Sequence, residues 1–139
     1  MMSEMFLDSS FAIALSAASD QYHRRAVEIS GVIEAQGTRL ITTHAVLLEI
    51  GNALSRQRYR RAAIQLLKSL HADPSILLVS LSDSLYQRAF QLFEGRWDKE
   101  WGMTDCLSFV VMEERSVHEA LTADHHFRQA GFRALLLDD

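Results

Sequence analysis

The chain has 139 residues, of which 48% are hydrophobic, and its 14 basic and 18 acidic residues give a formal net charge of −4. This composition suits one domain over residues 1–139 with a continuous apolar core, and it excludes a protein that binds nucleic acid through overall positive charge. A single cysteine cannot form an intramolecular disulfide, no signal-peptide pattern opens the chain, and no apolar run is long enough to span a membrane, so we expect a reducing, cytoplasmic setting.

The first predicted element is a strand in "MFLDSSFAIAL" that ends near Leu7. A short helix follows, and Ser9 or Ser10 is placed to cap it. Apolar side chains then recur at helical spacing over 20–36, and Gly37 is suited to end that helix.

The segment 39–43, "RLITT", is the second predicted strand, and Thr43 is positioned to cap a helix over 44–56. We expect the inward face of that helix to consist of Val46, Leu47, Ile50, Ala53 and Leu54. Another helix is expected over about 59–71. The run "SILLVSL", 75–81, is the clearest strand, because a continuous apolar run is expected in a sheet covered on both faces.

The remaining elements continue the alternation. The patterns predict a helix over about 84–96, a helix that begins at Thr104, a short strand that ends near Ala123 and a final strand over "RALLL", 133–137. Strands that alternate with helices indicate an α/β fold, a three-layer domain with a mainly parallel sheet. Ligands bind such sheets at the carboxyl ends of the strands.

Four acids fall where this edge of the sheet is expected. Asp8 and Asp124 each follow a predicted strand, Asp105 opens a predicted helix, and Glu49 lies at the edge of the apolar face of another. Each has an ordinary structural alternative, because Asp is common in turns and helix caps and a Glu side chain can extend to water.

If the four carboxylates converge, they repel one another, since two unit charges 4 Å apart cost roughly 4 kcal/mol at an effective dielectric of 20. A divalent cation removes that cost, and oxygen-only ligation suits Mg²⁺ or Mn²⁺. Setting the four aside leaves 14 basic and 14 acidic residues. The rest of the surface is then neutral and need not repel a polyanion.

A basic cluster lies in "SRQRYRRAAIQLLK". Its cations are Arg56, Arg58, Arg60, Arg61 and Lys68. A cluster of this kind can bind phosphates. The alternative is a well-solvated helix junction with no ligand.

Each of the four acids lies in its own motif. In chain order these motifs are "MFLDSSFAIAL", "TTHAVLLEIGNAL", "WGMTDCLSFVVMEE" and "ALTADHHFRQAGF". Together they resemble the PIN domain, and in particular the compact ribonuclease toxins of VapBC-type toxin–antitoxin pairs, over nearly the whole chain. The resemblance implies an α/β/α sandwich around a parallel sheet, with an acidic pocket at the carboxyl edge.

The resemblance also implies which residues act. The catalytic and metal-binding acids of the family fall on Asp8, Glu49, Asp105 and Asp124. Hydroxyls that help to orient those acids fall on Ser9, Thr104 and Thr122. Asp98 and Glu100 are rival acids in the segment before the third motif, and we expect Asp98 to be exposed or to lie behind the ligands.

The implied activity is Mg²⁺-dependent hydrolysis of RNA phosphodiester bonds, with Mn²⁺ as an alternative ion and with Arg56, Arg58, Arg60 and Arg61 along the RNA backbone. The implied partners are the RNA, a second copy of the chain and an antitoxin whose tail enters the cleft. Apolar residues within 22–33 and 59–70 serve these contacts or the core. The alternative function is a catalytically silent PIN-fold module that binds RNA or protein.

Other enzyme classes fit less well. Ser10 stands where an aspartyl phosphatase needs a second Asp. His125 and His126 are adjacent, and neighbouring residues face apart on a regular element, so we expect surface or cap residues here and not zinc ligands. The sequence also lacks a phosphate-binding glycine loop and a glycine-flanked serine turn.

Overall fold

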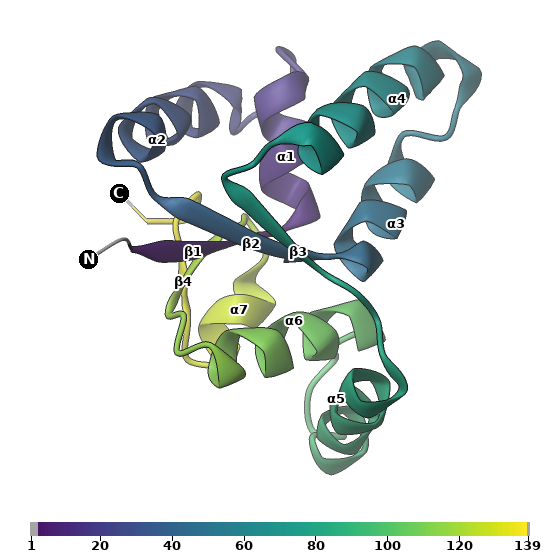
Figure 1. Cartoon of the computed structure of the whole chain (residues 1–139). Coiled ribbons are helices and arrows are strands. Elements are labelled where there is room, and N and C mark those ends of the chain that lie inside the picture. Colours follow the sequence, from purple (N-terminus) through teal and green to yellow (C-terminus); the bar gives the residue numbers. More distant parts are fainter. Residues whose placement is uncertain (1–2, 139) are drawn as a thin grey trace.

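The computed structural model describes residues 3–138 as an all-parallel, five-stranded sheet with helices on both faces (Figure 1). The strand order is β3-β2-β1-β4-β5. The strands are β1 (Glu4–Leu7), β2 (Arg39–Thr43), β3 (Ile76–Val79), β4 (Glu119–Leu121) and β5 (Arg133–Ala134). At least one helix lies between each pair of consecutive strands, as crossovers between parallel strands require.

Two layers of helices cover the sheet. One face carries α1 (Ser9–Ser16), α2 (His23–Gln36), α3 (His44–Ala53) and α4 (Gln57–Ala72). The other carries α5 (Asp83–Gly95), α6 (Met103–Glu114) and α7 (His125–Gln129). The predicted three-layer α/β fold with a parallel sheet is therefore confirmed. None of the helices among the described residues has the length and apolar content that crossing a membrane requires.

Two predicted helix boundaries are confirmed by their local chemistry. Thr43 caps α3, because its hydroxyl oxygen accepts a hydrogen bond from the backbone N–H of Val46 at 3.2 Å. Gly37 ends α2 in the left-handed region, at φ 66°, where a residue without a Cβ atom is unstrained. The predicted starts of the other long helices differ from the observed ones by one to three residues.

The first helix begins one residue earlier than its serines suggest. Asp8 is the N-cap of α1, so the expectation that Ser9 or Ser10 caps this helix is wrong. Both serines lie in the first turn, and their hydroxyls bond to groups on other elements. Tertiary partners therefore outcompete the local backbone for these side chains.

Two of the apolar segments differ from expectation, and one is confirmed. The strand predicted within 75–81 is β3, an edge strand of four half-buried residues in a sheet that helices cover on both faces. Ala53 is exposed and Leu54 half-buried because α3 ends there, whereas the earlier positions of the predicted inward face are buried. The last strand is shorter than predicted, because a turn over 135–137 follows Ala134.

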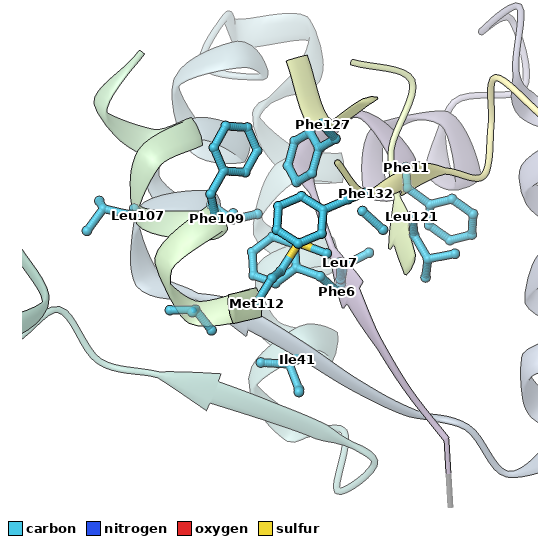
Figure 2. Packing of buried hydrophobic residues seen from close by; sticks show 14 of the residues in the cluster. Phe6, Leu7, Phe11, Ile41, Leu107, Phe109, Met112, Leu121, Phe127 and Phe132 are labelled. Atoms are coloured by element: carbon cyan, nitrogen blue, oxygen red, sulfur yellow. The ribbon is translucent and has the colours of Figure 1, made fainter. Parts of the chain in front are cut away.

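A cluster of aromatic rings packs α6 and α7 against the sheet (Figure 2). Phe109 on α6 is 2% exposed, and its ring centroid lies 5.0 Å from those of Trp101 and Phe127 and 5.7 Å from that of Phe132. Phe6 on β1 meets Phe127 at 6.2 Å. These contacts set where the first turns of α6 and α7 lie relative to β1 and β4.

The same packing brings four segments to one edge of the sheet. β1 pairs with β4 with Leu7 opposite Leu121, so the chain leaves both strands side by side. α3 contacts α6 beyond these strand ends. Asp8, the segment 122–124, the middle of α3 and the start of α6 are therefore neighbours.

We expect Phe109→Ala to lower the free energy of unfolding by about 3–5 kcal/mol, because it leaves a cavity among three aromatic neighbours. Urea unfolding followed by circular dichroism measures this change. Val32→Ala on α2, at a side chain that is 53% exposed, is the control and should cost less than about 1 kcal/mol. Equal losses for the two variants would contradict the described core.

Candidate active site

Asp8 follows β1 directly and is only 5% exposed. Its Oδ2 accepts a hydrogen bond from the hydroxyl of Thr122 at 2.7 Å. Burial raises the pKa of Asp8 from 3.8 to about 7; the Thr122 bond opposes this rise, and the charges of Glu49 and Asp105 add to it. A carboxyl group held in this way weakens the fold at neutral pH, and such groups are concentrated at functional sites.

A short network of hydroxyl groups holds Asp8 in place. Thr122 Oγ1 accepts from the backbone N–H of Asp124 at 3.0 Å and lies 3.2 Å from Ser10 Oγ. Because Thr122 donates its proton to Asp8, Ser10 is the donor in the contact between the two hydroxyls. Ser10 Oγ in turn accepts from the backbone N–H of Ala123 at 2.9 Å. The network ties the first turn of α1 to the segment after β4.

Glu49 reaches the site from α3. Its Oε1 accepts a hydrogen bond at 2.5 Å from the hydroxyl of Ser9, the residue next to Asp8. Burial raises the pKa of Glu49, the Ser9 bond lowers it, and the charges of Asp105 and Asp124 raise it further. Glu49 is thus a more basic carboxylate than an exposed glutamate, and it is held by a neighbour of Asp8.

Asp105 lies in the first turn of α6, where its Oδ2 accepts from the backbone N–H of Gly102 at 3.1 Å. The same oxygen lies 3.1 Å from Nδ1 of His126. Burial raises the pKa of Asp105, the Gly102 bond lowers it, and the charge of Asp124 raises it again. Helix capping therefore explains one contact of Asp105, while its burial beside another acid has no such explanation.

Asp124 is the N-cap of α7, and its Oδ1 accepts from the backbone N–H of His126 at 2.9 Å. The ring of His126 lies between two acids, with Nδ1 3.1 Å from Asp105 and 3.4 Å from Asp124. His125 is 69% exposed in its side chain, with Nδ1 3.8 Å from Asp124. The rings of the two histidines are 4.5 Å apart, so the expectation that they face apart is wrong. His126 bridges two elements of the site.

The four acids act on one another electrostatically. The pKa of Asp8, of Glu49 and of Asp105 is each raised in part by another member of the set. Carboxylate oxygens with an imidazole beside them are donors that suit a hard or borderline divalent cation, such as Mg²⁺ or Mn²⁺. The residues present therefore fit a divalent metal ion, and one donor atom each from Asp124, His125 and His126 lies within 4.8 Å of the others.

The rival acids of the preceding segment lie away from this arrangement. Asp98 is exposed and forms an ion pair with Arg96 at 3.0 Å, and Glu100 is exposed. Thr104 is half-buried, and within residues 3–138 no hydrogen bond joins its hydroxyl to an acid. Among the described contacts, sequence reasoning missed Ser10 and His126. Each lies two residues after a predicted acid, which is the signal that could have found it.

The arginines of the basic cluster are exposed at the start of α4, the helix that follows the one carrying Glu49. Arg60 donates to the carbonyl oxygen of Ser55, and Arg58 stacks over the ring of Tyr59 at 4.7 Å. Positive charge at a helix N-terminus opposes the helix dipole, so helix stability does not explain the cluster. Its cations remain accessible to an anionic ligand.

The sequence matches a family model described as the PIN domain over residues 5–133. It is also similar to a protein of Mycobacterium tuberculosis (strain CDC 1551 / Oshkosh) named 23S rRNA-specific endonuclease VapC20, at 26% identity over 128 residues. That match covers 92% of this chain and 95% of the relative. The protein of the same name from strain ATCC 25618 / H37Rv matches to the same extent.

Two solved structures resemble the fold. The crystal structure of Mycobacterium tuberculosis VapC20, described as a Sarcin-Ricin loop cleaving toxin, matches with a TM-score of 0.83 at 25% identity and covers 92% of this chain and 95% of that one. VapBC2 from Rickettsia felis, bound to a DNA fragment from its promoter, matches with a TM-score of 0.67 at 11% identity, over 94% and 96% of the two chains. The second likeness supports the fold alone.

The pKa of Asp8 gives a pH dependence of stability for the metal-free protein. The folded state binds the carboxyl proton of Asp8 more tightly than the unfolded state does. The stability that protonated Asp8 contributes is therefore complete below about pH 4 and is lost as pH rises through about 7. We expect Asp8→Asn to remove this loss and to be about 2–4 kcal/mol more stable than wild type at pH 8 in EDTA.

Urea unfolding from pH 4 to 8 measures this effect. Glu34→Gln, at an exposed position on α2, is the matched control and should follow the wild-type pH profile. If the free energies of unfolding of wild type and Asp8→Asn change equally with pH, the pKa of Asp8 is not raised by its surroundings.

Proposed function

The chain belongs to the PIN domain family, and on that basis we propose that it is a divalent-metal-dependent endoribonuclease, a single nuclease domain over 1–139 that acts as the toxin of a toxin–antitoxin pair. One observation carries the proposal: Asp8, Glu49, Asp105 and Asp124 come from four separate segments, and the charge of another of these acids contributes to raising the pKa of Asp8, of Glu49 and of Asp105. The name of the 26% identical relative, a 23S rRNA-specific endonuclease, supports RNA as the substrate class.

Asp8, Asp105 and Asp124 would hold the metal ion, Mg²⁺ or Mn²⁺. When bound, such an ion supplies Lewis acidity toward the phosphodiester and offsets the negative charge of the acids. Thr122 orients the Asp8 carboxylate through its hydrogen bond. His126 keeps Asp105 and Asp124 at a fixed separation through its contacts with both.

Glu49 orients the attacking water and accepts its proton, a role that its raised pKa favours. The Ser9 hydroxyl fixes the Glu49 side chain in position for that transfer. The water oxygen bonds to phosphorus, the bond from phosphorus to the 3′-oxygen breaks, and the departing oxygen takes up a proton. No side chain becomes covalently attached to the RNA.

The partners in this proposal are an RNA, a cognate antitoxin and a second copy of the chain, in the cytoplasm. A groove of about 560 Å³ between α1, α2 and α4 has an apolar floor that includes Phe11, Leu15, Ile33, Leu66 and Leu70. We assign the antitoxin to this groove, because an apolar groove between helices suits the apolar face of an amphipathic segment.

Replacing a central acid tests the nuclease proposal. We expect Asp105→Asn to lower kcat for Mg²⁺-dependent RNA cleavage by about 100-fold or more, because it removes a charged oxygen donor while the amide keeps the shape of the side chain. Asp98→Asn removes an equal charge from a side chain that is paired with Arg96 outside the site, and should keep wild-type activity. Sequencing of the RNA ends made by the active proteins identifies the cleaved bond.

Cleavage by Asp105→Asn at the wild-type rate, with both variants folded by circular dichroism, would contradict the proposal. Failure of the folded wild type to cleave any RNA in Mg²⁺ or Mn²⁺ would contradict it as well, and would favour the catalytically silent binding module.

The basic cluster gives a separate expectation. Arg58→Ala/Arg61→Ala should raise KM about tenfold with little change in kcat, and should reduce the salt dependence of RNA binding, because it removes phosphate contacts and no reacting group. Arg24→Ala/Arg39→Ala makes the same change in charge at exposed arginines elsewhere and is the control. Equal effects of the two double variants would mean that only net charge matters.

A further inference from the structure

The start of α7 places two imidazole rings beside the acids of the site. His125 and His126 are the first two residues of this helix, and their ring centroids lie 4.5 Å apart. Measured from Oδ1 of Asp124, Nδ1 of His126 is 3.4 Å away and Nδ1 of His125 is 3.8 Å away. Nδ1 of His126 also lies 3.1 Å from Oδ2 of Asp105. We call these four residues the nitrogen side of the site, because they combine two imidazoles with two carboxylates.

The distances on the nitrogen side match those between donors that share one metal ion. Donors about 2.1 Å from an ion, at angles of about 90–109°, lie about 3.0–3.4 Å from one another. The contacts of His126 with the two acids, 3.1 and 3.4 Å, fall in this range. The 3.8 Å contact between His125 and Asp124 reaches it by a small rotation of the exposed His125 ring. The nitrogen side therefore accepts an ion without a rearrangement of the backbone.

The fold does not account for the position of the His125 ring. Its side chain is 69% exposed, so it adds little to the core, and within residues 3–138 its ring makes no hydrogen bond. The cap of α7 consists of Asp124 and the backbone N–H of His126, and it needs no imidazole at position 125. Because the side chain of Asp124 is itself 30% exposed, an ion in solution can reach both residues.

The donor atoms decide which class of ion the nitrogen side prefers. Mg²⁺ binds oxygen ligands, keeps several of its waters and demands nearly octahedral geometry. Imidazole nitrogen suits borderline transition ions, whose affinity for a mixed nitrogen and oxygen site rises from Mn²⁺ to Co²⁺. A ligating imidazole is neutral, so the two histidines add donors without adding to the repulsion among the acids.

The opposite side of the site offers oxygen atoms instead. Asp8 accepts a hydrogen bond from the hydroxyl of Thr122, and Glu49 accepts one from the hydroxyl of Ser9. Oxygen donors of this kind suit Mg²⁺ and Mn²⁺ alike. Discrimination between the two classes of ion therefore depends on the imidazoles of the nitrogen side.

We propose that His125 and His126 are metal-binding residues, and that they make this site selective for a borderline transition ion over Mg²⁺. With its ring proton on Nε2, His126 offers the Nδ1 lone pair to the ion. This inference rests on the proposed function and specifies which class of ion its metal site takes. Its tests measure metal binding without RNA, so its failure is distinct from a failure of the nuclease proposal.

Calorimetric titration of the full chain at pH 8 with Co²⁺, and separately with Mg²⁺, tests the selectivity. His125→Ala should weaken Co²⁺ binding about tenfold or more and change Mg²⁺ binding less than about threefold, because it removes a nitrogen donor and no carboxylate. His118→Ala removes an exposed histidine outside the site and should bind both ions as wild type does. Wild type that does not bind Co²⁺, or a His125→Ala variant that binds it equally well, would overturn the proposal. An equal loss for both ions would do the same.

Pulsed electron paramagnetic resonance of the Mn²⁺-loaded chain tests the coordination itself. Wild type should show the nitrogen coupling of a bound imidazole, and His125→Ala/His126→Gln should lose it. The glutamine amide can still donate hydrogen bonds to Asp105 and Asp124, so the variant keeps the contacts that position them. Wild type without this coupling, or a double variant that retains it, would contradict the proposal. Nitrogen coupling in a protein that cleaves no RNA would uphold it and contradict the nuclease function.

Discussion

The enclosure of the Asp8 carboxyl group is the constraint on which the site depends. Its pKa of about 7 arises because β1 ends inside the molecule, where water cannot solvate the charge, and because other acids lie close to it. A fold optimised for stability would place a neutral residue there. The network of Thr122 and Ser10 holds the group in position without neutralising it. Burying the Asp8 carboxylate lowers the stability of the protein at neutral pH. A positively charged ligand that binds the carboxylate would offset this loss.

The fold class and the convergence of the acids follow from the sequence because both depend on short-range patterns. Strands that alternate with helices predict a parallel sheet, and acids that follow strands must meet at its carboxyl edge. The structural alternatives for these acids are also correct: Asp124 caps α7 and Asp105 accepts from the backbone at the start of α6. The oxygens that accept these backbone hydrogen bonds also lie beside Nδ1 of His126, so one interpretation does not exclude the other.

What the sequence does not predict depends on contacts between distant segments. The local sequence predicts Ser10 as a helix cap. Only the pairing of β4 with β1 brings Ala123 close enough for its backbone N–H to donate a hydrogen bond to the Ser10 hydroxyl. The local sequence predicts His126 as a surface or cap residue. The packing of α7 against α6, through Phe109 and Phe127, brings His126 beside Asp105. In each case a tertiary neighbour, absent from the local pattern, decides the outcome.

The basic cluster shows the same separation between stability and function. Arginines at the start of α4 act against the helix dipole, so they do not strengthen the isolated chain. In the proposed function these arginines contact the phosphates of the RNA.

The exchange of protons on metal binding tests the account most directly. Calorimetric titration of the full chain with Mn²⁺ at pH 7, in buffers of different ionisation enthalpy, counts the protons released per ion bound. If the buried acids hold the ion, Mn²⁺ binding is saturable and releases a fraction of a proton at pH 7. This release falls toward zero at pH 8.5, because Asp8 is then ionised before the ion binds. Binding without proton release at pH 7, or no binding at all, would contradict the claim that the buried acids form a metal site.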